Sequence, residues 1–229
     1  MEPDESSEAR WFLVSGGSGG IGSAICADLA SCGYKPVVGY HRNRDAAMDV
    51  ARRNRGVPLP LDMTSDASIE AAAQTLGELP RLYGAVLAGS PPLCPTPFGK
   101  ISAESMEEQW QVNVLGPQKL LAELVKRCFR KHKAGCVVGI LTRAMGDDSA
   151  PAASGMGAYV IAKYGMAGML RLLAADYPWL SVRSVSPGYT ETRMLEAFDP
   201  RFLELQRSKA PFQTPAEVAA QVMAEVIQP

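Results

Sequence analysis

Residues 11–22 read WFLVSGGSGGIG, and this stretch decides the fold of the chain. The apolar run Trp11–Ser15 predicts a buried strand, and Ile21–Ala30 has apolar positions at helical spacing. Five glycines lie in the seven positions 16–22 between them. Glycines at such a turn let the backbone bend tightly and let a pyrophosphate approach the amides at the helix N-terminus. The stretch therefore predicts a dinucleotide-binding strand, turn and helix.

The rest of the chain repeats this alternation of short apolar runs with helical patterns. Six runs are predicted as strands, at 11–15, 36–40, 57–61, 83–88, 136–142 and 182–186. Ile21–Ala30, Ala67–Leu76 and Met106–Arg130 are predicted helices. The alternation predicts an α/β fold: one doubly wound domain over residues 1–229, with a parallel sheet and helices on both faces. Ligands of such folds bind at the carboxyl ends of the strands.

Composition excludes several classes of protein. The chain has 229 residues, of which 47% are apolar and 21% charged, with a formal net charge of −1. This is a globular composition without the basic excess of a nucleic-acid-binding protein. The five cysteines form no CxxC pair, which favours reduced thiols over a disulfide framework or a metal site. The acidic start lacks the apolar core of a signal peptide, and no apolar run has the length of a membrane span. We expect a soluble cytoplasmic protein with no membrane or nucleic-acid partner.

The glycine-rich turn also matches two other motifs in part. It contains no lysine, which excludes a P-loop for ATP or GTP. Residues 16–20 match the GxSxG nucleophile elbow of hydrolases, but only His41 and His132 could complete a triad, and an elbow on the first strand would be misplaced. We therefore expect the turn to bind a cofactor. Its candidate contact residues are Gly16, Ser18, Gly20, Ile21 and Gly22.

The end of the second predicted strand indicates which dinucleotide is bound. An NAD site is expected to offer Asp or Glu here to the ribose 2′-hydroxyl. The sequence offers His41, Arg42 and Asn43 instead. A guanidinium can bind a 2′-phosphate through two hydrogen bonds. This favours NADP(H) as cofactor.

Three further motifs follow in order along the chain. They are Asn113 in VNVLG, Tyr159-Val-Ile-Ala-Lys163 at the start of a predicted helix, and Pro187-Gly-Tyr-Thr-Glu-Thr192 after the sixth predicted strand. With SGGSGGIG they resemble the TGxxxGxG, NxxG, YxxxK and PGxxxT elements of the short-chain dehydrogenase/reductase family. The resemblance covers nearly the whole chain and implies a Rossmann fold and hydride transfer between a nicotinamide cofactor and a carbonyl.

Tyr159 and Lys163 lie four residues apart, hence on one face of a helix. A tyrosine has a pKa of about 10, and a neighbouring ammonium, with the charge of oxidised nicotinamide, would lower it. We expect Tyr159 to protonate the carbonyl oxygen while hydride arrives from NADPH, and Lys163 also to bind the nicotinamide ribose. The resemblance implies that Asn113 holds a water that relays protons to Lys163.

The resemblance assigns further cofactor contacts. Asp62, followed by Met63, matches the carboxylate that accepts a hydrogen bond from adenine. Ala88 and Gly89 match the backbone near the adenosine ribose. The nicotinamide segment would include Pro187, Gly188, Thr190 and Thr192.

Three features depart from the family pattern. Val86-Leu87-Ala88-Gly89 replaces the usual NNAG. The usual catalytic serine is replaced by Thr142, our candidate for polarising the substrate oxygen; Ser149 and Ser154, in the predicted loop 143–156, are lesser candidates. The sequence stops after TPAEVAAQVMAEVIQP, where family members add a last strand, so we expect six strands rather than seven.

Two regions concern substrate and partner. Residues 189–213 are predicted to form a substrate lid that contains a short helix starting near Asp199-Pro200. The lid is partly apolar through Leu195, Phe198, Phe202 and Leu203. A last helix is predicted to begin at Thr214-Pro-Ala-Glu217, which supplies an N-cap, a proline at the first helical position and a capping-box glutamate. In similar proteins, the helices at 106–130 and 157–176 build a dimer interface, which predicts a homodimer. Packing of these helices within one chain is the alternative.

These observations favour an NADPH-dependent reductase of ketones or β-ketoacyl thioesters, resembling 3-oxoacyl-acyl-carrier-protein reductases and small biosynthetic ketoreductases. A non-catalytic dinucleotide-binding regulatory or scaffold protein on the same fold is the alternative, motivated by the three departures. Oxidation of a secondary alcohol with NAD is a third, which the sequence around Arg42 opposes.

Overall fold

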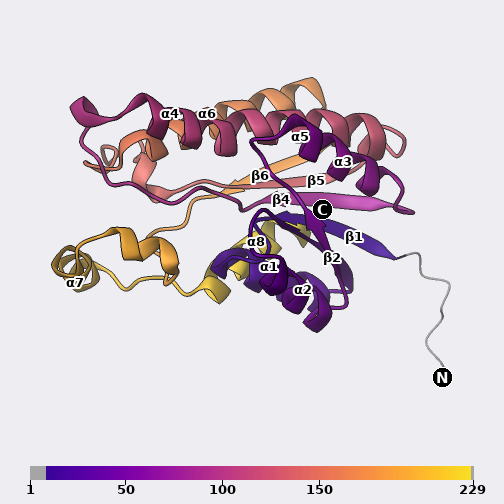
Figure 1. The fold of residues 1–229 in the computed structure, drawn as a ribbon, viewed down its shortest axis with the longest axis horizontal. Helices are drawn as coiled ribbons and strands as arrows, with labels where there is room; N and C mark the ends of the chain where they lie inside the picture. Colours follow the sequence, from indigo (N-terminus) through magenta and orange to yellow (C-terminus); the bar gives the residue numbers. More distant parts are fainter. Residues whose placement is uncertain (1–8, 228–229) are drawn as a thin grey trace.

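The computed structural model describes residues 9–227, and its centre is one parallel sheet (Figure 1). The strands are β1 (Arg10–Ser15), β2 (Tyr34–Tyr40), β3 (Val57–Pro60), β4 (Leu82–Leu87), β5 (Cys136–Ile140) and β6 (Ser181–Val185). Their order is β3-β2-β1-β4-β5-β6, and every neighbouring pair is parallel. The prediction of a six-stranded parallel sheet is confirmed. The order reverses between β1 and β4, which is where a doubly wound sheet binds its ligand.

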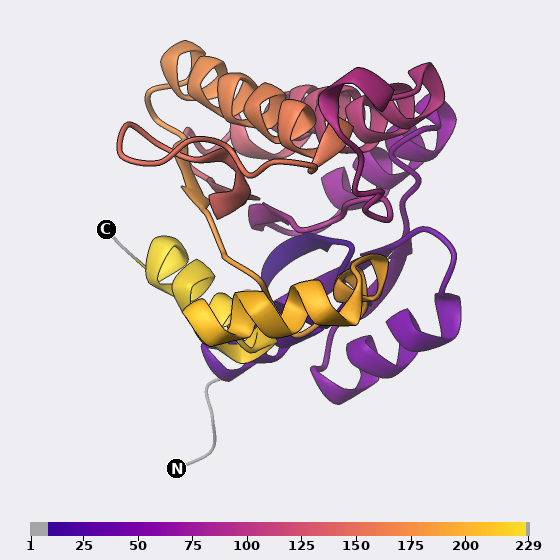
Figure 2. The same cartoon turned by 90° about the vertical axis from the view of Figure 1, so that its left-hand side faces the viewer.

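Helices cover both faces of the sheet. One face carries α1 (Gly20–Ser31), α2 (Arg44–Arg53) and α8 (Pro215–Ile227); the other carries α3 (Asp66–Gly77), α4 (Ala103–Trp110), α5 (Gly116–Leu124) and α6 (Gly157–Asp176) (Figure 1). The remaining helix, α7 (Pro200–Lys209), projects from the end of the molecule on the left of Figure 1. Figure 2 faces that end and shows α7 on the side of α8, opposite α6.

The core consists of two apolar layers, one on each side of the sheet. Successive strand residues point to opposite faces, so Leu13 packs with Leu120 and Leu124 under α5, while Val14 packs with Ile25 and Leu29 of α1. All six side chains are fully buried. Because both faces are covered, the strands read as continuous apolar runs, as expected for a parallel sheet.

The helix predicted over 106–130 is one continuous helical stretch with two local irregularities. Gln111–Leu115, between α4 and α5, and Val125–Phe129, after α5, are π-helical. Such π turns insert an extra residue and occur frequently at functional sites. Asn113 lies in the first of them, so the widened turn sets the direction of its side chain.

Local chemistry explains the boundaries of the C-terminal helices. Asp199 caps α7 by accepting a hydrogen bond from the Arg201 amide at 2.8 Å. Thr214 and Glu217 form a capping box at the start of α8: the Thr214 amide donates to Glu217 Oε2 at 2.6 Å, and the Glu217 amide donates to Thr214 Oγ1 at 3.2 Å. Both helix starts are as predicted.

One predicted strand end was wrong, and one helix was not predicted. Strand β5 ends at Ile140 rather than at Thr142, because Thr142 caps the short 3₁₀ helix Arg143–Met145 by accepting a hydrogen bond from the Ala144 amide at 3.2 Å. Helix α2 was not predicted; its apolar face is narrow and consists of the small residues Ala47 and Ala51, with Val50 partly buried, in an otherwise polar segment.

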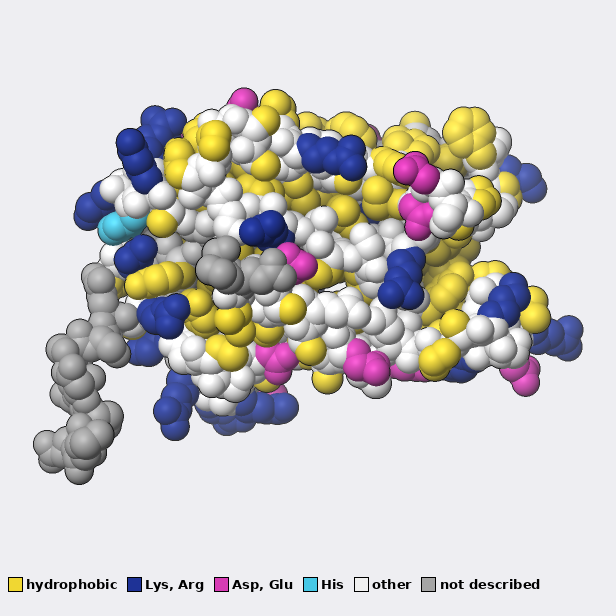
Figure 3. All heavy atoms as spheres, turned by 180° about the vertical axis from the view of Figure 1, so that it is seen from behind, with side chains coloured by type: hydrophobic (Ala, Val, Ile, Leu, Met, Phe, Trp, Pro, Cys, Tyr) yellow, Lys and Arg dark blue, Asp and Glu magenta, His cyan; other side chains and the backbone are white. Residues whose placement is uncertain are grey.

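The surface view from behind shows where side chains of each kind gather. Hydrophobic side chains line a hollow beside the α7 end, while Lys and Arg are most frequent at the opposite end (Figure 3). Within residues 9–227, no helix has both the length and the apolar composition that a membrane span needs. In the same part of the chain, no three His, Cys, Asp or Glu side chains come together as a group able to hold a metal ion.

Candidate active site

The glycine-rich turn is fixed against the end of β4. Gly16 has a φ of +64°, and a Cβ at this position would lie 2.7 Å from Gly89 Cα. A Cβ on Gly22 would lie 2.2 Å from the Gly16 oxygen. Ser15 Oγ accepts a hydrogen bond from the Gly89 amide at 3.3 Å. The glycine-rich turn is therefore packed tightly beside Ala88 and Gly89 and leads into the N-terminus of α1, a geometry suited to a bound phosphate.

The segment after β6 closes over this turn. A Cβ on Gly20 would lie 2.9 Å from Thr192 Cγ2, so the two predicted cofactor segments are adjacent. Gln213 holds the segment in place. Its side-chain Oε1 accepts a hydrogen bond from the Gly188 backbone amide at 2.9 Å, and its backbone amide donates to the Tyr189 backbone oxygen at 2.8 Å. Sequence reasoning missed Gln213, because its partners lie far from it in the sequence.

Charged side chains gather where β2 and β3 end. His41 Nε2 lies 3.3 Å from Asp62 Oδ2, and the Thr64 amide and hydroxyl donate to Asp62 Oδ1 at 2.9 and 2.7 Å. Burial raises the pKa of Asp62, but the Thr64 hydrogen bonds and the charges of His41 and Arg42 outweigh it and lower that pKa below its usual value. Arg42 is exposed. Its guanidinium remains available to an anion.

Asn43 has a defined structural role. Its Oδ1 accepts a hydrogen bond from the Ala46 amide at 3.0 Å and so caps α2. Of the three residues predicted for a 2′-phosphate, the structure thus commits Asn43 to the helix and pairs His41 with Asp62.

These residues fit a nicotinamide dinucleotide on two observations. The cradle at Gly16 and Gly22 has no room for a Cβ. The hydroxyl of Ser90, which directly follows Gly89 and lines the cavity described below, is buried with no hydrogen-bond partner among the described residues. Ser90 is a second residue that sequence reasoning missed. A buried hydroxyl without a partner is costly unless a ligand satisfies it.

Lys163 is the most deeply buried cation of the site. It is 3% exposed, and its Nζ donates a hydrogen bond to the Ile140 oxygen, at the end of β5, at 2.8 Å. The Nζ also lies 5.6 Å from the centre of the Tyr159 ring. Burial lowers the pKa of Lys163 from its usual value to about 7. Its charge therefore changes in the physiological pH range.

Tyr159 lies one helical turn before Lys163 on α6, and Thr142 lies beside it. Burial raises the pKa of Tyr159, and a hydrogen bond with the Thr142 side chain opposes this effect. Burial dominates, so the pKa of Tyr159 lies above its usual value; the lowering expected from Lys163 together with oxidised nicotinamide stays a prediction. Thr142 is thus paired with the tyrosine, as a residue that polarises the same oxygen would be.

Asn113 is fully buried in the π-helical turn 111–115, which packs against α6. Its Nδ2 donates to the backbone oxygen and to Oε1 of Gln109, both at 3.0 Å. Its Oδ1 has no partner among the described residues. The buried acceptor is consistent with the water-holding role that the family resemblance implies.

One cavity of about 420 Å³ joins these elements. Tyr159, Lys163 and Thr142 line it together with Gly188 and Thr192 of the segment after β6. Leu195 and Phe198, from the predicted lid, also line it, whereas Phe202 and Leu203 do not. Ser149 and Ser154 are exposed and lie outside the lining. Thr142 is therefore the hydroxyl that the structure brings to the tyrosine.

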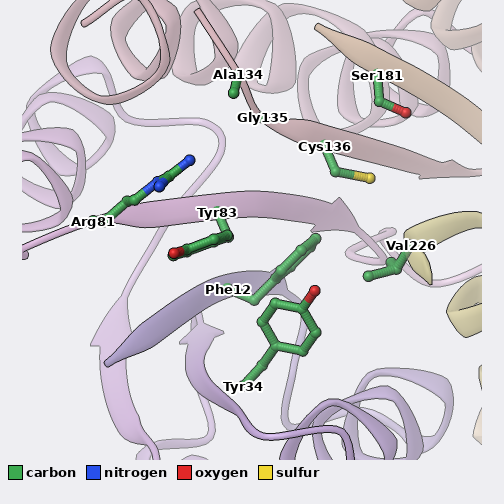
Figure 4. A pocket seen from close by; sticks show the side chains of 9 residues that line it. All are labelled: Phe12, Tyr34, Arg81, Tyr83, Ala134, Gly135, Cys136, Ser181 and Val226. Carbon is green, nitrogen blue, oxygen red and sulfur yellow. The ribbon is translucent and has the colours of Figure 1, made fainter. Parts of the chain in front are cut away.

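A second cavity, of about 220 Å³, lies at the opposite end of the sheet (Figure 4). Side chains from the beginnings of the strands line it, among them Tyr34, Tyr83 and Cys136. Burial raises the pKa of the Cys136 thiol to about 11, so this sulfur stays protonated near neutral pH. The cavity is separate from the residues of the candidate active site.

Comparison with known proteins agrees with this arrangement. Acetoacetyl-CoA reductase from Acinetobacter sp. is 29% identical over 231 residues, covering 95% of this chain and 90% of the relative. The 3-oxoacyl-(acyl-carrier-protein) reductase MabA of Mycobacterium bovis is 27% identical over 227 residues, covering 93% and 84%. Both alignments extend over nearly the whole chain.

Solved structures share the fold. Actinorhodin polyketide ketoreductase with NADPH superimposes with a TM-score of 0.85 at 19% identity, covering 95% of this chain and 90% of that one. A 3-ketoacyl-(acyl-carrier-protein) reductase from Brucella melitensis complexed with NADH gives 0.84 at 20% identity, covering 98% and 93%. The profile of the short chain dehydrogenases matches residues 10–201. The chain is a member of the short-chain dehydrogenase/reductase family, an oxidoreductase on a nicotinamide-dinucleotide-binding Rossmann fold.

Proposed function

We propose that the protein is an NADPH-dependent carbonyl reductase that converts a ketone or a β-ketoacyl thioester into a secondary alcohol. The observation that carries the proposal is the convergence of Thr142, Tyr159 and Lys163 in one cavity with the nicotinamide segment at Gly188. The two relatives named above are reductases of acetoacetyl-CoA and of 3-oxoacyl thioesters. Their names support the substrate class.

The side chains divide the chemistry between them. Reduced nicotinamide supplies a hydride to the carbonyl carbon. The Tyr159 hydroxyl donates a proton to the carbonyl oxygen, and Thr142 holds that oxygen by a second hydrogen bond. Because the pKa of Lys163 lies at about 7, its ammonium can return a proton to Tyr159, directly or through a water held by Asn113 Oδ1. General acid catalysis of this kind contributes about 100- to 10,000-fold to a rate.

The choice of NADPH rests on the end of β2. Arg42 is an exposed guanidinium that follows His41, whose Nε2 contacts Asp62, and no Asp or Glu stands among residues 41–43 to bind a ribose 2′-hydroxyl. A guanidinium binds phosphate through two charge-assisted hydrogen bonds. We assign the 2′-phosphate to Arg42, with His41 at the side of the same pocket.

The protein is also proposed to be a homodimer through helices 106–130 and 157–176. Trp110 on α4 and Tyr164 and Leu172 on α6 are 36%, 52% and 63% exposed. A Cβ on Gly168 would meet no atom within 4 Å, whereas Gly165 packs against Trp110 within the chain. Gly165 therefore serves intramolecular packing, and Gly168 leaves a surface that a second copy can approach.

The test is NADPH consumption with a panel of small ketones and β-ketoacyl thioesters, run on the wild type and on Tyr159→Phe. The wild type should oxidise NADPH only in the presence of a carbonyl, and Tyr159→Phe should bind NADPH with unchanged affinity but lose about 100-fold or more of kcat. Equal turnover by the variant would overturn the assignment of the proton donor. NADPH binding without turnover of any carbonyl would favour the regulatory or scaffold alternative.

A further inference from the structure

The active-site cavity carries two positive charges that the proposed chemistry does not use. Arg143 directly follows Thr142, and Lys209 is the last residue of α7. Both line the cavity that contains Tyr159. Of the described residues that line it, none is Asp or Glu. Neither cation lies within 4.0 Å of a carboxylate of residues 9–227.

The backbone of Arg143 is held beside the nicotinamide segment, and its exposed side chain lines the cavity. Its amide donates a hydrogen bond to the Pro187 oxygen at 2.9 Å. Its Cδ lies 3.7 Å from the position of a Cβ on Gly188. The side chain thus leaves the backbone between the Thr142 hydroxyl and the nicotinamide segment. Lys209 faces the same space from the segment 189–213, so the two charges come from two different walls.

Arg207, another cation on α7, is neutralised by a carboxylate, unlike Arg143 and Lys209. Arg207 pairs with Glu191 at 2.9 and 3.0 Å and lies 4.7 Å from the centre of the Phe212 ring, outside the cavity lining. The chain as a whole has 23 basic and 24 acidic residues, so its composition does not account for an all-basic cavity. Apolar walls of low dielectric strengthen the field of such charges on a ligand.

Most of the remaining lining is apolar. Leu93, Met156, Leu195 and Phe198 lie around Tyr159 and supply space for a carbon skeleton. A ligand that fills this cavity and satisfies its charges therefore has an apolar middle and an anionic group, with the carbonyl placed at Tyr159.

We propose that the substrate is a carbonyl compound with a carboxylate or phosphate group, and that Arg143 and Lys209 bind this anion. The inference rests on the proposed reductase function and adds the substrate class. The planar guanidinium of Arg143 binds a carboxylate or a phosphate through two parallel hydrogen bonds, and the Lys209 ammonium adds a point charge. The anion thereby orients the carbonyl towards Tyr159 and Thr142.

The experiment compares substrates that differ at the anionic group. For a carboxylate source, 4-oxopentanoate, 5-oxohexanoate and 6-oxoheptanoate are compared with their methyl esters. For a phosphate source, acetoacetyl-4′-phosphopantetheine is compared with acetoacetyl-pantetheine. Each pair is measured with NADPH on the wild type, Arg143→Met, Lys209→Met and, as matched control, Arg201→Met, an α7 cation outside the cavity lining.

In the wild type, one pair should show a KM about 10- to 100-fold lower for the anionic member than for the neutral one. Arg143→Met should abolish this difference. The same variant should leave the KM of the neutral member and the KM of NADPH unchanged. Arg143→Lys should restore part of it, and Arg201→Met should have no effect. Equal KM values within both pairs, or an Arg143→Met effect on NADPH alone, would overturn the proposal while leaving the reductase function intact.

If no carbonyl is reduced, the reductase function fails and the anion site is judged by binding. Isothermal titration of the NADP-loaded protein then compares pentanoate with pentanamide. Tighter binding of pentanoate that is lost in Arg143→Met supports the anion site, and equal binding of the two contradicts it.

Discussion

Lys163 Nζ donates a hydrogen bond to the Ile140 oxygen at 2.8 Å, and this contact ties the catalytic helix α6 to the end of β5. Thr142 follows Ile140 by two residues, and its side chain is hydrogen-bonded to Tyr159. Tyr159 lies on α6, one turn before Lys163. A single buried cation thus fixes the relative position of the two hydroxyls that the substrate oxygen meets. The geometry of catalysis and the local stability of the fold depend on the same side chain.

Lys163 makes the stability of the protein depend on pH. Its pKa is about 7 in the folded chain and about 10.4 in an unfolded one, because burial disfavours the ammonium. Between these values the unfolded chain binds more protons, so stability rises with pH and the penalty is largest below pH 7. In urea unfolding at pH 7, 8 and 9, the free energy of unfolding of the wild type should rise relative to that of Lys163→Met by up to ~1.4 kcal/mol per pH unit. A constant difference between the two proteins would contradict the burial argument.

Replacing Thr142 should affect the pH profile as well as the rate. The hydrogen bond from Thr142 lowers the pKa of Tyr159, so Thr142→Ala should move the pKa seen in kcat/KM upward and reduce kcat by about 10-fold or more. Thr142→Ser keeps the hydroxyl and should retain most of the activity. If Thr142→Ala behaved like Thr142→Ser, the hydroxyl would have no part in catalysis.

Arg42 should set the choice between cofactors. Arg42→Leu removes the proposed 2′-phosphate ligand, which should raise the KM for NADPH about 10- to 100-fold and leave the KM for NADH unchanged. Arg53, at the far end of α2 and paired with Asp49, gives a matched control in Arg53→Leu. An equal rise for both cofactors would show that Arg42 does not distinguish them.

Gly22 should not tolerate any side chain. Its Cβ would meet the Gly16 oxygen at 2.2 Å and Gly17 Cα at 2.8 Å, both backbone atoms that cannot turn away. Gly22→Ala should lower the free energy of unfolding by about 2 kcal/mol and abolish NADPH binding. Gly99→Ala, where no atom lies within 4 Å, should instead leave NADPH binding unchanged and raise stability by about 0.4–1 kcal/mol, because alanine reduces the conformational entropy of the unfolded chain. Calorimetry and fluorescence titration of the two variants compare these effects.

The proposed dimer makes a prediction about mass in solution. Light scattering of the wild type should give twice the 24.5 kDa of one chain, and Leu172→Glu on α6 should give the mass of one chain. Leu205, 55% exposed on α7, provides the control Leu205→Glu, which should remain a dimer. A monomeric wild type would show that the exposed surface of α6 has another use.

The sequence predicted those features that depend on local pattern. The strands, the glycine-rich turn and the capping box of Thr214 and Glu217 each follow from a few adjacent residues, and the structure contains all of them. Tyr159 and Lys163 lie four residues apart on one helix, so their proximity was also predictable.

Contacts between distant segments were not predictable. Ser15 with Gly89, Gln213 with Gly188, and the buried hydroxyl of Ser90 depend on how loops from different strands meet. The same holds for the electrostatics. The pKa of Tyr159 was expected to fall next to an ammonium and oxidised nicotinamide, but burial of the tyrosine raises it in the structure.

The central claim is hydride transfer from the nicotinamide C4 to a carbonyl carbon in the Tyr159 cavity. Its most direct measurement uses NADPH deuterated at C4, prepared separately in each stereochemical form, with mass spectrometry of the product. The account predicts an alcohol that carries one carbon-bound deuterium from one form of the cofactor and none from the other, formed about 100-fold or more slowly by Tyr159→Phe. An alcohol without deuterium from either form, or no alcohol from any carbonyl tested, would contradict it.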